Sequence, residues 1–282
     1  KSTENYREFT SRWSAEATRV QPPMCEGELV SVFIKSQELD FYDRIGAVGD
    51  CGINTVEFWK WTNKDVDKVK RLLDENKMKL SVFNIDSTDE ALSYDLSRGI
   101  LNSGRADEFV SALGESIPVY KKLNASAMIV LIGENAPYCE ENVLKCLNAA
   151  KPICEKENVT LIIEPLNDID RVGYSMPYAK PVFKLLKKVN SPNIKMLYDI
   201  YHQNMMGDFS MEDIRKNIDL IGHFHVADAP GRHEPGTGKV DYVKILSEIS
   251  ALPYSGYIGL EYRATKNDGK TFGFLRETKL ID

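Results

Sequence analysis

The chain has 282 residues, of which 43% are hydrophobic and 28% are charged, as is typical of a globular protein. No apolar run approaches the roughly 20 residues that a membrane-spanning helix needs, so we predict no membrane segment. The formal net charge of -6 opposes binding to a phosphate backbone, which excludes nucleic acid as an expected partner.

Cysteine usage indicates a reducing compartment. The five cysteines are odd in number and lack the C-x-x-C spacing of zinc ribbons and redox sites, so we expect free thiols. We therefore expect a cytoplasmic protein. Because the chain begins at Lys1 rather than at methionine, earlier removal of an export signal stays an alternative.

Residues 1–24 are polar with scattered aromatic side chains and end in Gln21-Pro22-Pro23. This composition predicts an N-terminal arm laid against the main body. The remainder, residues 25–282, is predicted to form one domain.

Strand and helix patterns alternate along that domain. Strands are predicted at 28–34, 53–59, 78–84, 125–132, 159–165, 193–199, 220–226 and 256–262. Helices are predicted at 38–50, 64–76, 105–123, 138–157, 177–189, up to about 217, and 241–250. The strand runs are apolar throughout, as in parallel strands that are covered on both faces, and eight such units predict a (β/α)₈ TIM barrel of the α/β class. A doubly wound sheet would usually carry a Gly-rich turn after its first strand, and none follows here.

Polar residues close six of the predicted strands. In a barrel the carboxyl ends of the strands meet at one rim, where reactive groups collect. One polar strand end is more often a cap, but the coincidence of six predicts a site. The six residues are Glu57, Asn84, Glu164, Asp199, His225 and Glu261.

Four of these residues form the predicted metal site. Carboxylates with one imidazole suit Mn²⁺, Mg²⁺ or Co²⁺, with Zn²⁺ as a less favoured alternative, and we expect one divalent ion. The alternative is a charge network with some of the 36 Lys and Arg residues. Clustered carboxylates repel one another, which favours the cation. The predicted ligands are Glu164, Asp199, His225 and Glu261.

Several polar and aromatic residues near this rim are candidates for substrate contacts. His202 follows Asp199 by three residues, with helix capping as its alternative role. Arg232 lies in the Pro- and Gly-rich loop 229–238 and can grip an anionic or hydroxylated substrate, or be exposed on the surface. The other candidates are Asp170, Asn84 and Trp59, the last as an apolar wall. His223 shares the face of His225, and we expect it one layer deeper in the core, with a role as a second metal ligand as the alternative.

The segments VEFWKW, LIIEPLN, YDIYHQNMMGD, VADAPGRHEPGTG and GLEYR resemble the hydroxypyruvate isomerase family, a branch of the xylose isomerase-like barrels that includes the ketose 3-epimerases. The resemblance covers most of residues 28–263. It implies one metal ion on the four predicted ligands, with Glu164 and Glu261 as acid/base groups. It also implies substrate contacts by His202, Arg232, Glu57 and Asp170. The chain departs from hydroxypyruvate isomerases in having His225 where they tend to carry Gln, whereas the epimerases carry His.

We therefore predict a metal-dependent isomerase or epimerase of a small keto-sugar or hydroxy-carbonyl compound, acting through an enediolate. A keto-sugar lyase or dehydratase begins with the same proton abstraction and is the nearest alternative. A metal-dependent endonuclease needs more than the four histidines present, and a non-catalytic sugar-binding barrel needs neither glutamate. The expected partner is a small molecule, and assembly into a homo-oligomer stays open.

Overall fold

A computed structural model describes residues 30–33, 40–50 and 52–265. The predicted arm at 1–24 and the aromatic tail residues Phe272 and Phe274 lie outside these ranges. Of the cysteines within them, Cys139, Cys146 and Cys154 are free thiols, as predicted.

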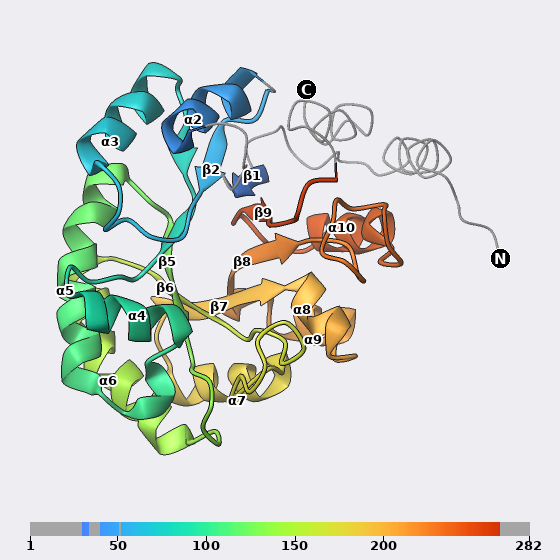
Figure 1. Cartoon of the computed structure of the whole chain (residues 1–282). Coiled ribbons are helices and arrows are strands. Elements are labelled where there is room, and N and C mark those ends of the chain that lie inside the picture. Colours follow the sequence, from blue (N-terminus) through green and yellow to red (C-terminus); the bar gives the residue numbers. More distant parts are fainter. Residues whose placement is uncertain (1–29, 34–39, 51, 266–282) are drawn as a thin grey trace.

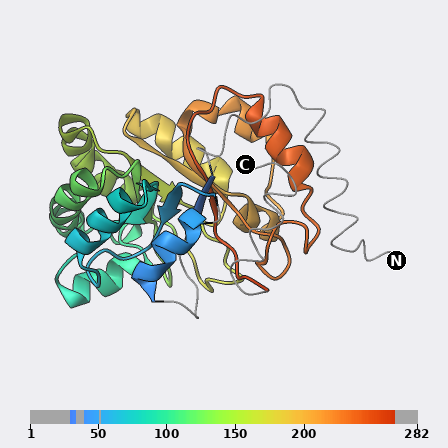
Figure 2. The ribbon, with the colours of Figure 1, turned by 90° about the horizontal axis from the view of Figure 1, so that it is seen from above.

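The strands form a closed parallel barrel, seen from the side in Figure 1 and from above in Figure 2. One predicted strand is divided into β3 and β4 by Ser81. The N–H of Ser81 donates to the carbonyl of Val56, and its own carbonyl accepts from the N–H of Ser126, so this strand, or stave of the barrel, is hydrogen-bonded to both of its neighbours. Pairing of β1 with β9 completes the ring, so the eight predicted staves are confirmed. The strands are β1 Val30–Phe33, β2 Thr55–Glu57, β3 Lys79–Leu80, β4 Val82–Asn84, β5 Ala127–Leu131, β6 Leu161–Glu164, β7 Ile194–Asp199, β8 Ile221–Val226 and β9 Ile258–Leu260.

Helices cover the outside of the staves (Figure 1). They pack through apolar stripes: α7 buries Val182, Phe183 and Leu186 and leaves its lysines exposed. The helices are α2 Phe41–Asp50, α3 Val66–Glu75, α4 Glu90–Arg98, α5 Ala106–Leu123, α6 Glu140–Glu157, α7 Ala179–Val189, α8 Ile200–Met205, α9 Met211–Lys216 and α10 Tyr242–Ser250, with short 3₁₀ turns η1 Leu101–Ser103 and η2 Ile218–Leu220. Within the described ranges, no helix is long and apolar enough to cross a membrane.

Two helical regions differ from the prediction. Helix α4 was not predicted; its sequence buries Leu92 and Leu96 on one face, and Asp89 caps its first turn. The helix expected to end near 217 is two helices. Gly207 has φ of +65° after α8, and Ser210 caps the new helix α9.

Strand register places the candidate residues at one rim of the barrel. Asp199 is the register partner of His225, and His225 is in turn the partner of Gly259. Glu164 ends β6 opposite Leu131, and Glu57 ends β2. Parallel pairing thus brings the ends of separate strands to the same end of the barrel.

Candidate active site and metal centre

The structure brings the four predicted metal ligands together. Each offers one ligand atom, and these atoms all lie within 4.8 Å of one another. His225 Nδ1 lies 3.1 Å from Glu261 Oε2 and 3.6 Å from Glu164 Oε1. Asp199 is nearly fully buried, at 1% exposure, and its side chain also caps α8 through the N–H of His202.

A divalent ion fits this donor set. Ligand atoms about 2.1 Å from an octahedral ion lie about 3.0 to 4.2 Å apart. The separations of 3.1 Å and 3.6 Å from His225 Nδ1 to Glu261 and Glu164 fall within this range, and the limit of 4.8 Å for the whole cluster is slightly wider. Glu164 Oε1 and His225 Nδ1 are buried in the described structure without a hydrogen-bond partner, so neither atom is committed to another protein group by a hydrogen bond. Three carboxylate oxygens and one imidazole nitrogen could therefore hold a hard or borderline cation.

The cluster carries uncompensated negative charge. Burial raises the pKa of Glu164, and the nearby Glu261 carboxylate raises it further. Burial also raises the pKa of Asp199, against the lowering effect of Arg232. Burial would raise the pKa of Glu261 too, but Arg232 and His225 more than offset it and hold that pKa low. Ionising all three carboxylates here is unfavourable without a cation.

Arg232 supplies part of the opposite charge. Its Nη2 atom lies 2.5 Å from Glu261 Oε2 and 4.0 Å from Asp199 Oδ2. Among the described residues Glu164 has no Lys or Arg nitrogen within 4.0 Å, and its ion-pair partner is His225 Nδ1 at 3.6 Å, so the predicted network of Lys and Arg accounts for only part of the cluster.

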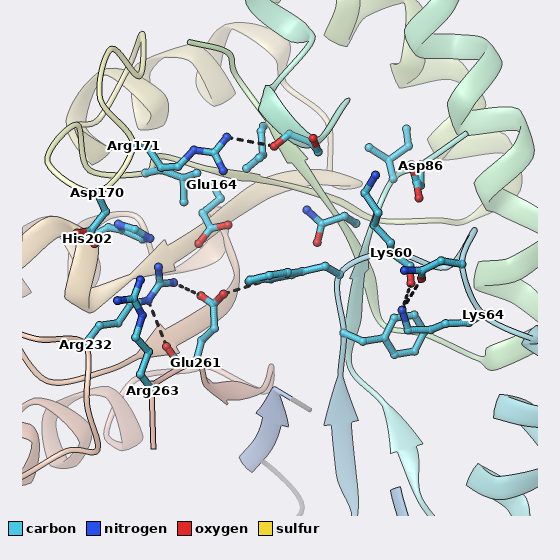
Figure 3. A pocket seen from close by; sticks show the side chains of 18 of the residues that line it. Lys60, Lys64, Asp86, Glu164, Asp170, Arg171, His202, Arg232, Glu261 and Arg263 are labelled. Atoms are coloured by element: carbon cyan, nitrogen blue, oxygen red, sulfur yellow. Dashed lines mark hydrogen bonds and ion pairs between the residues drawn. The ribbon is translucent and has the colours of Figure 1, made fainter. Parts of the chain in front are cut away.

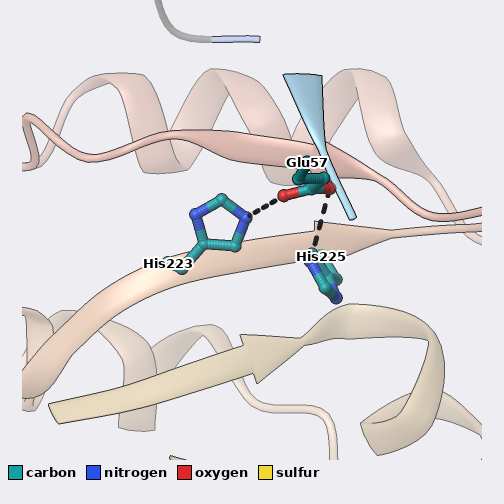
Figure 4. Close-up of side chains that lie close together, drawn as sticks. All are labelled: Glu57, His223 and His225. Atoms are coloured by element: carbon teal, nitrogen blue, oxygen red, sulfur yellow. Dashed lines mark hydrogen bonds and ion pairs between the residues drawn. The ribbon is translucent and has the colours of Figure 1, made fainter. Parts of the chain in front are cut away.

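Glu57 lies behind the cluster rather than in the cavity. It is fully buried and is not among the residues that line the cavity. Figure 4 shows its carboxylate between two histidines: Oε2 lies 3.0 Å from His223 Nε2, and Oε1 lies 3.4 Å from His225 Nε2. The substrate contact that the resemblance implied for Glu57 stays a prediction without support in this geometry. His223 is buried beside Glu57, in a group with His225 that could also hold a metal ion.

His202 presents a neutral imidazole to the cavity. The backbone N–H of Asn167 donates to His202 Nδ1 at 3.0 Å, so the proton of the neutral ring is assigned to Nε2. Burial, followed by the charge of Arg232, lowers its pKa to about 4. Nε2 is buried without a hydrogen-bond partner in the described structure, with Asp199 Oδ2 3.5 Å away, and can donate to a ligand oxygen.

The loop that carries Arg232 is held by a residue that sequence reasoning missed. Asp228 accepts hydrogen bonds from the N–H groups of Ala229, Gly236 and Val240. Arg232 itself has φ of +56°, which is unfavourable for a residue with a side chain. The buried Asp228 carboxylate therefore organises a loop whose conformation is not intrinsically favoured.

The cluster opens into a cavity of about 580 Å³. In Figure 3, Glu164, Glu261, His202 and Arg232 lie at one end, while Lys60 and Lys64 lie at the other. The predicted contact residues Trp59, Asn84 and Asp170 also line it.

Trp59 and Asp170 are joined to the site by hydrogen bonds. Trp59 Nε1 donates to Glu261 Oε1 at 3.2 Å. Tyr201, which was not predicted, donates to Asp170 Oδ2 at 2.7 Å and lies beneath the Arg232 guanidinium, 5.3 Å from the ring centre. Tyr201 directly precedes His202 in the YDIYH segment, and this position beside a candidate residue could have indicated that it lies at the site.

Comparison with known proteins places these features in a family. Residues 45–278 match the family model described as a xylose isomerase-like TIM barrel. Hydroxypyruvate isomerase of Escherichia coli (strain K12) is 31% identical over 80% of this chain and 89% of its own length. The 2-oxo-tetronate isomerase of Cupriavidus necator is 28% identical over 84% of this chain and 92% of its own length.

A solved structure agrees in fold. The crystal structure of an AP endonuclease of family 2 from Brucella melitensis has a TM-score of 0.81 and 25% identity, over 88% of this chain and 98% of that one. The chain therefore belongs to the family of xylose isomerase-like TIM barrels, in its hydroxypyruvate isomerase branch.

Proposed function

We propose that the protein is a divalent-metal-dependent isomerase or epimerase of a small keto-sugar or hydroxy-carbonyl compound. The observation that carries the proposal is the placement of Glu164 and Glu261 in one cluster, with His225 Nδ1 within 3.6 Å of the first and 3.1 Å of the second. The activities of the Escherichia coli and Cupriavidus necator relatives support the same class of reaction.

The two glutamates act as the acid/base pair. A bound divalent ion supplies a Lewis acid that polarises a carbonyl oxygen and makes the neighbouring C–H more acidic. Glu164 and Glu261 come from different staves, so one can remove the proton and the other can return one. Return to the same carbon from its other side gives an epimer, whereas return to the adjacent carbon gives aldose–ketose isomerisation.

The remaining polar groups orient the substrate. His202 donates through Nε2 as a neutral imidazole, which stabilises a developing oxyanion without delivering a full charge. Arg232 offers the guanidinium N–H groups that Glu261 does not use. Trp59, which is 41% exposed beside Glu261, forms a wall against the carbon chain of the substrate.

An endonuclease activity, suggested by the name of the Brucella melitensis protein, has weaker support. Across the described ranges, the groups of His, Cys, Asp and Glu that could hold a metal are two, and both include His225. This arrangement suits one ion rather than a cluster of several. A keto-sugar lyase would use the same first step and differ in its product.

Solvent deuterium exchange tests the proposal. Ketoses, inososes and hydroxypyruvate are incubated in deuterated water with the metal-loaded protein and followed by NMR, which reports substrate and reaction type together. Exchange into a carbon next to the carbonyl is expected in the wild type and should be lost in Glu164→Gln and Glu261→Gln. Exchange that persists in both variants, or in metal-free protein, would refute the mechanism.

A further inference from the structure

Two lysines line the cavity at the end remote from the glutamates. Lys60 follows Trp59 after β2, and Lys64 lies in the turn before α3. Figure 3 shows both ammonium groups at this end, with Glu164 and Glu261 at the other. Asp86 lies with the two lysines, whereas three cationic side chains accompany the glutamates at their end: Arg171, Arg232 and Arg263.

Both lysines are held in defined positions by neutral groups. Lys60 Nζ donates to Ser93 Oγ of α4 at 2.8 Å. Lys64 Nζ donates to Asn63 Oδ1 at 2.8 Å and to the carbonyl of Lys60, and it lies 4.6 Å from the centre of the Phe41 ring. Such fixed ammonium groups lose less conformational entropy on binding an anion than freely rotating surface lysines do.

Neither lysine has a carboxylate within 4.0 Å in the part of the chain that the structure describes. The other charged residues that line this end are Arg44 and Asp86. Burial lowers the pKa of Lys64 to about 8; Asp86 opposes this shift, while Arg44 and Lys60 add to it. Lys60 and Lys64 thus lie near one carboxylate, that of Asp86, and an incoming anion would offset the repulsion between the two ammonium groups.

We propose that Lys60 and Lys64 form an anion subsite, which binds a carboxylate or phosphate carried by the substrate at the end of its carbon chain remote from the reacting carbonyl. This inference rests on the proposed function and narrows its substrate class to acidic ketoses. An anionic group attached directly to the carbonyl carbon, as in hydroxypyruvate, would lie at the glutamate end and would not reach the lysines. A carboxylate and a phosphate both place negatively charged oxygen atoms at the end of the substrate, which is the feature that the lysines would recognise.

Binding measurements with three matched ketoses test the subsite. D-Fructose, D-fructuronate and D-fructose 6-phosphate share six carbons and a carbonyl at C2, and they end in an alcohol, a carboxylate and a phosphate. Their dissociation constants are measured by calorimetry on metal-loaded wild type, Lys60→Met, Lys64→Met and Lys187→Met. Lys187 is an exposed lysine of α7, so the last variant controls for the loss of one positive charge.

The wild type should bind one or both acidic ketoses roughly 10- to 100-fold more tightly than D-fructose, as expected for hydrogen bonds to charged groups. The preferred acidic ketose distinguishes carboxylate from phosphate. This preference should fall in each subsite variant and persist in Lys187→Met. It should also weaken between pH 7 and pH 9 as Lys64 loses its proton, and this dependence should be absent in Lys64→Met.

Equal affinity for all three ketoses, or a preference unchanged in both subsite variants, would overturn the subsite. Because binding needs no turnover, the outcome is separate from that of the proposed function. If acidic ketoses bind more tightly through the lysines but no deuterium is exchanged, the proposed isomerase is refuted and the subsite stands. If deuterium is exchanged but acidic ketoses are not preferred, the subsite is refuted and the proposed isomerase stands. Two single variants are used so that a folding defect in one leaves the other as a test.

Discussion

Glu57 lies behind the candidate metal centre, beside His225. A metal-binding histidine usually donates its second ring N–H to a carboxylate, which fixes the tautomer and makes the ligating nitrogen more basic. Glu57 Oε1, 3.4 Å from His225 Nε2, is placed for this role and leaves Nδ1 for the ion. A Cβ atom at Gly259 would overlap both Glu57 and His225, so this glycine permits their approach.

Replacement of Glu57 by Gln is therefore expected to weaken divalent-ion binding about 10- to 100-fold. The amide keeps the size of the side chain but removes the charge that orients and polarises His225. Titration with Mn²⁺ against a competing chelator measures the dissociation constant without substrate. Glu212→Gln, an exposed site on α9, should bind the ion like the wild type. Unchanged affinity in Glu57→Gln would remove the positioning role.

His202 should make folding stability depend on pH. Its pKa falls from 6.5 to about 4 on folding because the ring is buried. The unfolded chain thus binds the proton more tightly, so the stability contributed by this group is lost as the pH falls from about 6.5 to about 4. The free energy of unfolding contributed by this group changes by at most roughly 3 kcal/mol.

The variant His202→Gln isolates this effect. Urea unfolding at several pH values gives the free energy of unfolding of wild type and variant. Between pH 6.5 and 4 the wild type should lose more stability than the variant. Parallel curves would show that His202 does not titrate as its surroundings indicate.

The sequence predicted the site residues that end strands better than the residues that hold those side chains in place. The four candidate ligands each close an apolar run, so topology alone gathers them. The contact between Glu57 and His223 joins residues 166 positions apart, and only the register of the closed barrel determines it. Asn167 accepts hydrogen bonds from the N–H groups of Ile169 and Asp170, which is a local turn, but its contact with His202 joins residues 35 positions apart.

The loop between β8 and α10 shows how one element controls the geometry of the site. Three N–H groups converge on Asp228, and Gly238 packs so closely that a Cβ atom there would overlap the Asp228 carboxylate. The position of Arg232 beside Glu261 thus depends on this loop as a whole.

Disruption of the loop should impair catalysis more than stability. Asp228→Ala and Gly238→Ala are both expected to lower kcat/KM roughly 10- to 100-fold by displacing Arg232, since small misplacements of orienting groups are costly. Steady-state kinetics on a substrate identified by deuterium exchange, with thermal melting alongside, measures both effects. Gly114→Ala, where a Cβ meets nothing within 4 Å, should leave kcat/KM near the wild type and keep or slightly raise the melting temperature, because alanine favours the helix α5 more than glycine does. Equal kcat/KM in all three variants would contradict this role of the loop.

At the scale of elements, the long helices were predictable, and so was the 9-residue α10, whereas the equally short α4 was not. The 18-residue helices α5 and α6 fall where the apolar pattern predicts them. Helix α4 has only 9 residues, which gives its apolar spacing little weight in the sequence. It nevertheless positions Ser93 against Lys60, a contact that no local signal announces.

At one rim of the barrel, folding buries carboxylates whose ionised forms are thereby destabilised. Burial of Glu164 and Asp199 raises the pKa of each, so their ionisation opposes folding. An acid whose pKa is raised on folding contributes stability at low pH that is lost as the pH rises through the folded pKa. A divalent ion reverses this penalty because it binds the ionised carboxylates.

Metal binding should therefore stabilise the whole protein in a pH-dependent manner. Ligand protons must leave before the ion binds, so the difference in Tm between metal-loaded and chelator-treated protein should be larger at pH 8 than at pH 5. With Mn²⁺ at about 100 times its Kd, the stabilisation is about 2.7 kcal/mol. Thermal melting at both pH values measures the difference. Asp199→Asn should reduce it, whereas Glu212→Gln should match the wild type. An equal shift at the two pH values would mean that the ion binds elsewhere, since only ligands that titrate in this range couple ion binding to pH.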